Sequence, residues 1–141
     1  MATQTMMTGM QGVFLVAAEL SYRGFVVSPT SRSAIGADLL VTDQRCRKAW
    51  SVQVKTNRVR AVGWLVSKGA EDISSDSHIY VFVKLQKDGQ LRPDFYVVPS
   101  DVVARNMLRG EWRAFRTKPA DRERYKEAWR VFGDPLGREV P

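Results

Sequence analysis

The sequence is poor in the residues that most often build metal sites and nucleophilic catalytic centres. It has one cysteine, Cys46, and one histidine, His78. These counts exclude an internal disulfide framework, a cysteine-rich zinc site and a His–His metal pair, and a lone cysteine suits a reducing compartment, so we expect a cytoplasmic protein. No apolar run reaches membrane-spanning length, and the N-terminus lacks the basic-then-apolar order of a signal peptide, so we expect no membrane association.

Acidic side chains are missing from two long stretches of the chain. The first charged residue is Glu19, and residues 44–70 carry seven Lys and Arg residues but no acid. The whole chain has 22 basic and 15 acidic residues and a net charge of +7, so residues 44–70 alone hold a surplus equal to that of the molecule. Such a surplus favours a polyanionic partner. The length of 141 residues, with 44% hydrophobic and 26% charged residues, predicts one globular domain and excludes wholesale disorder, collagen and coiled coil.

The N-terminal element is predicted to be a buried helix from Thr8 to Arg23. Thr8 and Gln11 have the spacing of a capping box, and Gly24 fits the position just after a helix. The segment between them is apolar on every side, which is typical of a buried helix. Residues 1–7 lack a pattern, and we expect a frayed start there.

The rest of the chain reads as strands followed by helices. Strands are predicted at 24–30, 37–43, 49–56, 78–85 and 93–98, with 64–66 as a further candidate. Asp88-Gly89 predicts a hairpin turn between the last two long strands. Helices are predicted at 100–109, capped by Ser100, and at 119–132, where apolar residues recur at helical spacing. This order predicts a single α/β (α+β) domain over residues 1–141, with a core at about 8–104 and a helical extension at about 105–135.

Two neighbouring strands are expected to bring three polar side chains together. In the strand 49–57, Gln53 and Lys55 face the same way because strand side chains alternate. If the hairpin closes symmetrically about residues 45–46, each cross-strand pair of residue numbers sums to 91, and Asp38 lies directly opposite Gln53. Lys55 then lies one step further along the same face. A slip of one residue would turn the set to the other face, so the register is itself a prediction.

A carboxylate, an amide oxygen and an ammonium at one place indicate phosphate chemistry. Asp and Gln oxygens are hard ligands that suit Mg²⁺, which keeps several waters and accepts phosphate oxygens. The Lys55 ammonium would then hold an attacking water or neutralise charge that develops on a phosphoryl group. The alternative is that Asp38 and Lys55 form a structural ion pair at the edge of the sheet.

These residues also resemble a known motif. The paired motif of the PD-(D/E)XK nuclease superfamily is similar to two segments of this chain, Ile35-Gly36-Ala37-Asp38-Leu39-Leu40-Val41 and Ser51-Val52-Gln53-Val54-Lys55-Thr56. Residues 9–12 and 18–25 resemble the first helix and strand of the small members of this superfamily. Those members include archaeal Holliday-junction resolvases, some homing endonucleases and many uncharacterised bacterial proteins. A weaker similarity extends through residues 80–83 and 95–100, so the resemblance covers roughly residues 9–104. The resemblance implies a restriction-endonuclease-like fold, a mixed β-sheet flanked by helices in which an αβββ unit precedes a β-hairpin and C-terminal helices.

The resemblance implies a role for each residue of the set. Asp38 would be the metal-binding Asp, Gln53 would hold the second ligand position, and Lys55 would be the catalytic Lys. Gln53 replaces the usual acid of the motif, as it does in some active members, and Val13 stands where many small relatives have Glu. Glu19 is six residues later and about 600° further around the helix, so it either joins the site from another direction or caps a neighbouring strand.

Together these features predict a Mg²⁺- or Mn²⁺-dependent endonuclease that hydrolyses the phosphodiester bonds of DNA. We expect the DNA backbone to be bound by the basic residues around the motif strands, Arg45, Arg47, Lys48, Arg58 and Arg60, unless these form only a solvated turn. Small nucleases of this kind act as dimers because each site cuts one strand, so we expect a homodimer, and no small-molecule cofactor. The alternative, favoured by Val13 and Gln53, is a degenerate relative that binds nucleic acid or a protein partner without cleavage. A purely structural subunit is a third possibility.

Overall fold

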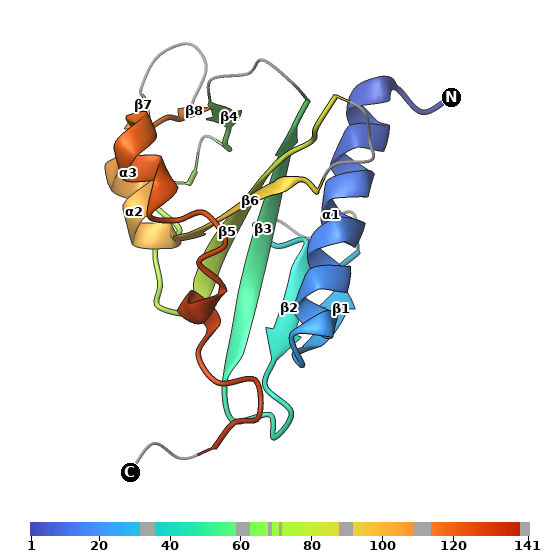
Figure 1. Ribbon diagram of the computed structural model, residues 1–141, viewed down its shortest axis with the longest axis vertical. Helices are drawn as coiled ribbons and strands as arrows, with labels where there is room; N and C mark the ends of the chain where they lie inside the picture. The colour runs from blue at the N-terminus through green and yellow to red at the C-terminus, as the bar shows by residue number, and fades with distance from the viewer. Residues whose placement is uncertain are drawn as a thin grey trace.

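A mixed five-stranded sheet, in the order β1-β2-β3-β5-β6, forms the centre of the computed structural model (Figure 1). The model describes residues 1–31, 36–58, 63–67, 69–70, 72–87, 92–108 and 114–138. The strands of the central sheet are β1 (Val26–Pro29), β2 (Leu39–Thr42), β3 (Ala49–Asn57), β5 (His78–Lys84) and β6 (Asp94–Pro99). A second sheet, in the order β4-β8-β7, consists of β4 (Trp64–Leu65), β7 (Met107–Leu108) and β8 (Ala114–Phe115). The helices are α1 (Gln4–Tyr22), α2 (Ser100–Arg105), α3 (Pro119–Glu123) and the 3₁₀ helix η1 (Trp129–Phe132).

Helix α1 begins earlier than the sequence pattern indicated. Thr3 is the N-cap, and its side chain accepts a hydrogen bond from the backbone N–H of Met6 at 3.2 Å. Residues 4–7 are therefore helical, and the prediction of a frayed start is wrong for them. The C-terminal end is as predicted, because Gly24 directly follows the C-cap residue Arg23 and has a positive φ of 96°.

Only one stripe of α1 is buried. The buried residues are spaced four apart and face the sheet: Thr8, Gly12, Val16 and Leu20. Gly12 permits the close approach, because a Cβ atom there would overlap the Thr56 hydroxyl and lie 2.8 Å from the Thr56 Cβ. The other side of the helix exposes large apolar side chains: Met6, Met7, Met10, Phe14 and Tyr22. The prediction of burial on every side is therefore wrong, since the sheet covers one face and the helix has apolar residues on more than that face.

The strand register around β3 agrees with the register predicted from the sequence. β2 and β3 pair antiparallel, with Leu39 opposite Val52, so the residue numbers sum to 91. β1 is antiparallel to β2, while β3 and β5 are parallel. β5 and β6 pair antiparallel, as a hairpin requires, although the predicted Asp88-Gly89 turn lies outside the described residues.

Both faces of the sheet are packed at β5 and β6. Alternate residues of β5 point to opposite sides, so that Val81 joins a core with Val16 and Leu20 of α1 and with residues of η1. Phe82 faces the other way and packs with α2 and with the β4-β8-β7 sheet. No helix in the described ranges is both long and apolar enough to cross a membrane.

The segment after β6 is less helical than predicted. α2 ends at Arg105 and β7 follows directly, so the helix does not continue to about residue 109. The Ser100 side chain does not cap α2, since its hydroxyl donates to the Ser75 carbonyl at 2.9 Å and accepts from the Ser75 N–H at 3.0 Å. Residues 105–135 therefore include two short strands and are not the helical extension that the sequence indicated.

The predicted helix over 119–132 is divided into α3 and η1. Between them, the backbone bonds to β6 in place of the helix: the N–H of Val97 donates to the Tyr125 carbonyl at 2.9 Å, and the N–H of Glu127 donates to the Phe95 carbonyl at 2.8 Å. Glu127 has a positive φ of 53°, which a continuous α-helix does not allow. The apolar periodicity was real, because Trp129 and Phe132 are buried, but pairing with β6 overrides the helix that it predicted.

Candidate active site

Asp38 lies where β2 separates from β3. β2 begins at Leu39, opposite Val52, whereas β3 continues to Asn57. Residues 53–57 of β3 therefore have no β2 residue opposite them. The backbone N–H of Asp38 donates to the Val52 carbonyl at 2.8 Å and anchors the chain at the point of separation. The separation opens the edge of β3 to ligands.

The Asp38 carboxylate is held against β3 in the predicted position. Its Oδ2 accepts hydrogen bonds from Gln53 Nε2 at 2.9 Å and from the Val54 backbone N–H at 2.8 Å. Its other oxygen, Oδ1, accepts no hydrogen bond from the described residues. The carboxylate is thereby oriented with one oxygen left for a ligand.

Lys55 shares the side of β3 that carries Gln53. The structure shows no ion pair between Lys55 and Asp38, nor between Lys55 and any other carboxylate of the described residues. The structural ion pair considered as the alternative is therefore absent, and Asp38 is instead fixed by the Gln53 amide and the Val54 N–H. The Lys55 ammonium is left for a negatively charged ligand.

All three side chains line one open cleft of about 900 Å³, a volume within the range of ligand pockets. One wall is the C-terminal half of β3, and the other is the N-terminal half of α1, which lie side by side in Figure 1. Thr30, just after β1, closes one end, and its hydroxyl donates to the Ala37 carbonyl at 2.6 Å. We call the part of the cleft that is lined by Asp38, Gln53 and Lys55, on the strand side, its floor.

The structural comparisons decide the fold. The bacterial homing endonuclease I-Ssp6803I superposes with a TM-score of 0.59 at 17% identity, over 93% of this chain and 91% of its own. A Holliday junction resolvase, Hjc from the archaeal hyperthermophile Archaeoglobus fulgidus, superposes with a TM-score of 0.58 at 14% identity, over 89% and 96%. The fold is that of the restriction-endonuclease-like nucleases. No family model and no curated protein match the sequence.

The restriction-endonuclease-like fold places Val13 on the wall of this cleft. The resemblance implied that many small relatives have Glu at this point of the first helix, where this cleft has the apolar side chain of Val13. The described residues contain no group of three or more His, Cys, Asp or Glu side chains that could hold a metal ion. The Asp38 carboxylate and the Gln53 amide are two oxygen donors that line the cleft side by side. They suit Mg²⁺ because this ion is often held by one or two carboxylates, several waters and substrate phosphates.

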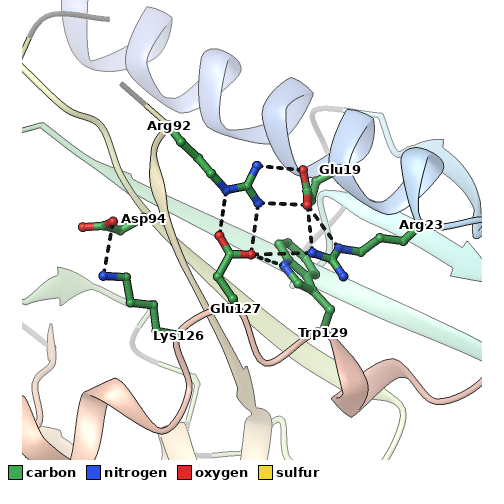
Figure 2. A network of polar contacts seen from close by, with 7 residues as sticks. All are labelled: Glu19, Arg23, Arg92, Asp94, Lys126, Glu127 and Trp129. Carbon is green, nitrogen blue, oxygen red and sulfur yellow. Dashed lines mark hydrogen bonds and ion pairs between the residues drawn. The ribbon is translucent and has the colours of Figure 1, made fainter. Parts of the chain in front are cut away.

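Glu19 does not line the cleft, so its predicted place in the site is corrected. Figure 2 shows its carboxylate between two guanidinium groups, with Arg92 Nη2 at 2.9 Å and Arg23 Nη2 at 3.1 Å. Arg92 also binds Glu127 at 2.9 Å, and Glu127 accepts a hydrogen bond from Trp129 Nε1 at 2.6 Å. Glu19 therefore joins α1 to the residues just before β6 and to the segment that leads into η1.

The pKa shifts of Arg92 and Glu127 follow from the contacts of this network. The hydrogen bonds that Arg92 donates to the Glu127 and Glu19 carboxylates raise the pKa of Arg92 above its usual value. Burial would raise the pKa of Glu127, but hydrogen bonds from Arg92 and Trp129 outweigh it and lower that pKa. Both groups are thus held in their charged forms at neutral pH. The role of this network is to fix α1, one wall of the cleft, against the rest of the fold.

The predicted nucleic-acid-binding residues occupy two separate places. Arg58 lies on the cleft wall, and its Nε donates to Thr8 Oγ1 of α1 at 2.8 Å. Arg45, Arg47 and Lys48 are exposed on the β2–β3 turn at the other end of β3. Lys55 follows Lys48 by seven residue steps of about 3.3 Å each, so the turn is about 23 Å from the floor of the cleft. Arg60 lies outside the described residues.

The basic turn is rigidly built around Asp43. This buried carboxylate accepts hydrogen bonds from the backbone N–H groups of Arg45 at 2.8 Å, Arg47 at 3.2 Å and Lys48 at 2.7 Å. Burial alone would raise the pKa of Asp43, but these three bonds outweigh it and lower that pKa. The side chains of the turn consequently point outward from a fixed backbone.

Several cleft residues were missed because they lie in the segment expected to be frayed or buried. The first turns of α1 contribute Gln4, Thr5, Met6, Thr8, Met10 and Phe14 to the cleft wall. Thr3 followed by Met6 at N-cap spacing was the available signal for the early helix start. The sequence carried no signal for which apolar side chains of an all-apolar helix would face the cleft.

Proposed function

We propose that this protein is a metal-dependent DNA endonuclease that hydrolyses phosphodiester bonds in the cleft between α1 and β3. The observation that carries the proposal is the meeting of Asp38, Gln53 and Lys55 at the point where β2 leaves β3. The restriction-endonuclease-like fold and the basic side chains near the cleft support it. DNA is the substrate class because its backbone supplies both a phosphodiester and the negative charge that Lys55 and Arg58 would neutralise.

Each residue has a role that its geometry supports. The free Oδ1 of Asp38 and the carbonyl oxygen of Gln53 would hold Mg²⁺ or Mn²⁺. A bound divalent cation supplies Lewis-acid chemistry and a more acidic water. The Gln53 amide N–H keeps the Asp38 carboxylate in one orientation. Lys55 orients the nucleophilic water and neutralises the charge that develops on the phosphate oxygens.

The more distant basic residues would extend the contact with DNA. The turn that carries Arg45, Arg47 and Lys48 lies about 23 Å from the floor of the cleft, a distance that about seven base pairs of duplex cover. We propose that these residues bind the phosphate backbone on one side of the scissile bond. Because one cleft holds one site, cleavage of both strands of a duplex would require two copies, and we propose a homodimer acting in the cytoplasm.

The second candidate function is nucleic-acid binding without cleavage. The occupation of Asp38 Oδ2 by two N–H donors and the apolar Val13 wall favour it, because both reduce the number of ligands available to a metal. In this case Asp38 would serve to hold β2 against β3, and Lys55 and Arg58 would bind phosphate.

A cleavage assay with conservative variants separates the two functions. Supercoiled, branched and single-stranded DNA are incubated with Mg²⁺, Mn²⁺ or EDTA. Asp38→Asn keeps an oxygen that accepts the Val54 N–H, and Lys55→Met keeps the apolar stem, so both variants should fold. We expect each to reduce the cleavage rate by about 100-fold or more while DNA remains bound. Asp101→Asn and Lys118→Met, on exposed side chains outside the cleft, are matched controls that should cut at the wild-type rate.

Two results would reject catalysis. One is the absence of cleavage by the parent protein with either metal, and the other is equal cleavage by the parent and by Asp38→Asn. If the parent binds DNA but does not cut it, the double variant Val13→Glu, Gln53→Glu adds two carboxylates to the cleft. If calorimetry detects Mn²⁺ binding only in this double variant, the result would support nucleic-acid binding without cleavage. The cleft wall of the parent protein would then have lost a metal site.

A further inference from the structure

The α1 wall of the cleft is uncharged and carries a row of apolar side chains. The first 18 residues of the chain carry no charged side chain. Three of them, spaced four apart along α1, line the cleft with large exposed side chains: Met6 is 45% exposed, Met10 37% and Phe14 59%. Leu65 of β4, 57% exposed, lies on the same cleft. We call these four residues the apolar wall.

The strand side of the cleft carries two cations, Lys55 and Arg58, beside the Asp38 carboxylate. Lys55 faces the cleft without a carboxylate partner among the described residues, and Arg58 follows at the end of β3. Arg58 uses its Nε to bind Thr8, which holds the guanidinium at the junction of the two walls. The cleft therefore offers positive charge on the strand side and apolar surface on the helix side.

We propose that the cleft binds a single-stranded DNA segment, with its phosphates along Lys55 and Arg58 and its unstacked bases against the apolar wall, where Phe14 stacks on a base. This inference rests on the proposed function and names its substrate class. A single strand has anionic groups on one side and flat apolar faces on the other, and proteins that bind it combine basic grooves with exposed aromatic rings. An intact duplex hides its base faces within the stack and presents phosphates and sugars, which the apolar wall does not match.

Gly9 provides independent support. It lies inside α1 and on the cleft, and an added Cβ would meet no atom within 4 Å. Packing therefore does not require a glycine there, although glycine in a helix interior costs about 1 kcal/mol relative to alanine. Gly9 leaves the helix backbone without a side chain between the residues of the apolar wall. A planar ring therefore has room to approach the helix there.

A protein partner on the same wall is the competing occupant. The apolar wall and the strand side enclose the same cleft, so a second copy or another protein seated on Phe14 would cover Asp38 and Lys55. That occupant would leave the two cations facing an apolar surface without a negative partner. Charge complementarity thus favours nucleic acid, and oligomeric state becomes one readout of the test.

The test compares strands that differ only in their bases. Fluorescence anisotropy in EDTA measures binding of a labelled oligothymidylate of about 15 nucleotides and of an abasic strand of equal length and charge. The variants are Phe14→Leu, which removes the ring, and Phe14→Trp, which restores one. Tyr22→Leu is the matched control, because Tyr22 is an 87% exposed aromatic residue of α1 that does not line the cleft.

We expect the parent to bind oligothymidylate roughly 5- to 100-fold more tightly than the abasic strand. Phe14→Leu should reduce this ratio about five-fold or more without changing the affinity for the abasic strand, and Phe14→Trp should restore it. Tyr22→Leu should match the parent. Equal affinity of the parent for the two strands, or an unchanged ratio in Phe14→Leu, overturns the inference. A parent dimer in sedimentation that Phe14→Leu converts to monomer overturns it as well, since the apolar wall would then be a protein interface.

Cleavage measured in parallel distinguishes this failure from failure of the proposed function. If Mg²⁺-dependent cleavage occurs and Asp38→Asn abolishes it, but binding does not depend on bases, only the single-strand inference is lost. If binding depends on the bases and on Phe14 but no strand is cut, the proposed endonuclease function is rejected, and the cleft is a site that binds single-stranded DNA.

Discussion

Two glycines of α1 should respond differently to the same substitution. An alanine Cβ at Gly9 would meet no atom within 4 Å. An alanine Cβ at Gly12 would overlap the Thr56 hydroxyl and lie 2.8 Å from the Thr56 Cβ. Thr56 belongs to β3 and is β-branched, so it cannot rotate away cheaply. The helix would have to move off the sheet.

The expected free energies follow from these contacts. Replacing a helix-interior glycine by alanine stabilises a helix by about 1 kcal/mol, so Gly9→Ala should raise the free energy of unfolding by about that amount. At Gly12 the same gain is opposed by overpacking, which costs about 1 to 3 kcal/mol and more where backbone must shift. Because the helix gain is common to both variants, we expect them to differ by the overpacking cost of about 1 to 3 kcal/mol, with Gly12→Ala the less stable.

Urea denaturation monitored by circular dichroism measures the difference directly. The Gly12→Ala midpoint should lie below the Gly9→Ala midpoint at an unchanged slope, and the melting temperatures should differ by about 3 to 12 °C. Adding Thr56→Ala to Gly12→Ala removes the overlapping hydroxyl and should recover part of the loss. Equal stability of Gly9→Ala and Gly12→Ala would refute the close approach of α1 to β3, and with it the geometry of the cleft.

Two further predictions concern His78 and Arg92. Burial lowers the pKa of His78 below 6.5, so the stability that its neutral form contributes is present above pH 6.5 and is lost as the pH falls through the lowered pKa. Because the chain has one histidine, its imidazole resonance should titrate below pH 6.5. His78→Gln should remove the loss of stability between about pH 7 and pH 5. A titration at or above pH 6.5 would contradict the burial argument. Arg92→Met breaks the bonds to Glu19 and Glu127 and should lower the free energy of unfolding by about 1 to 2 kcal/mol, with a smaller effect in 1 M NaCl. Arg105→Met, which breaks an exposed pair with Asp101, should cost less than about 0.5 kcal/mol, and an equal loss in both variants would show that the network adds nothing.

The part of the site that could be predicted lies in one hairpin. Strict alternation in β3 and the short polar turn before it determined the register, and both are local features of the sequence. Asp38 consequently lies opposite Gln53, as expected. The side of β3 that carries Lys55 followed from the same alternation.

The errors arose where distant segments decide the structure. Glu19 is fixed by Arg92, 73 residues away, and no pattern near Glu19 indicates that partner. The helix predicted at 119–132 is interrupted because its backbone bonds to β6. The apolar composition of α1 carried no information on which face would be covered. The basic stretch was continuous in sequence, but an extended strand separates its turn from its cleft residues.

The hairpin also leads us to expect an order in which the candidate site assembles during folding. Antiparallel strands joined by a short turn pair in about 1 to 10 μs, whereas the parallel pairing of β3 with β5 must first close the crossover formed by residues 58–77. We therefore expect Asp38, Gln53 and Lys55 to meet through local contacts before the sheet is complete. The three groups of the candidate site lie within residues 38–55, and the rest of the chain can diverge in sequence while it changes only what reaches them.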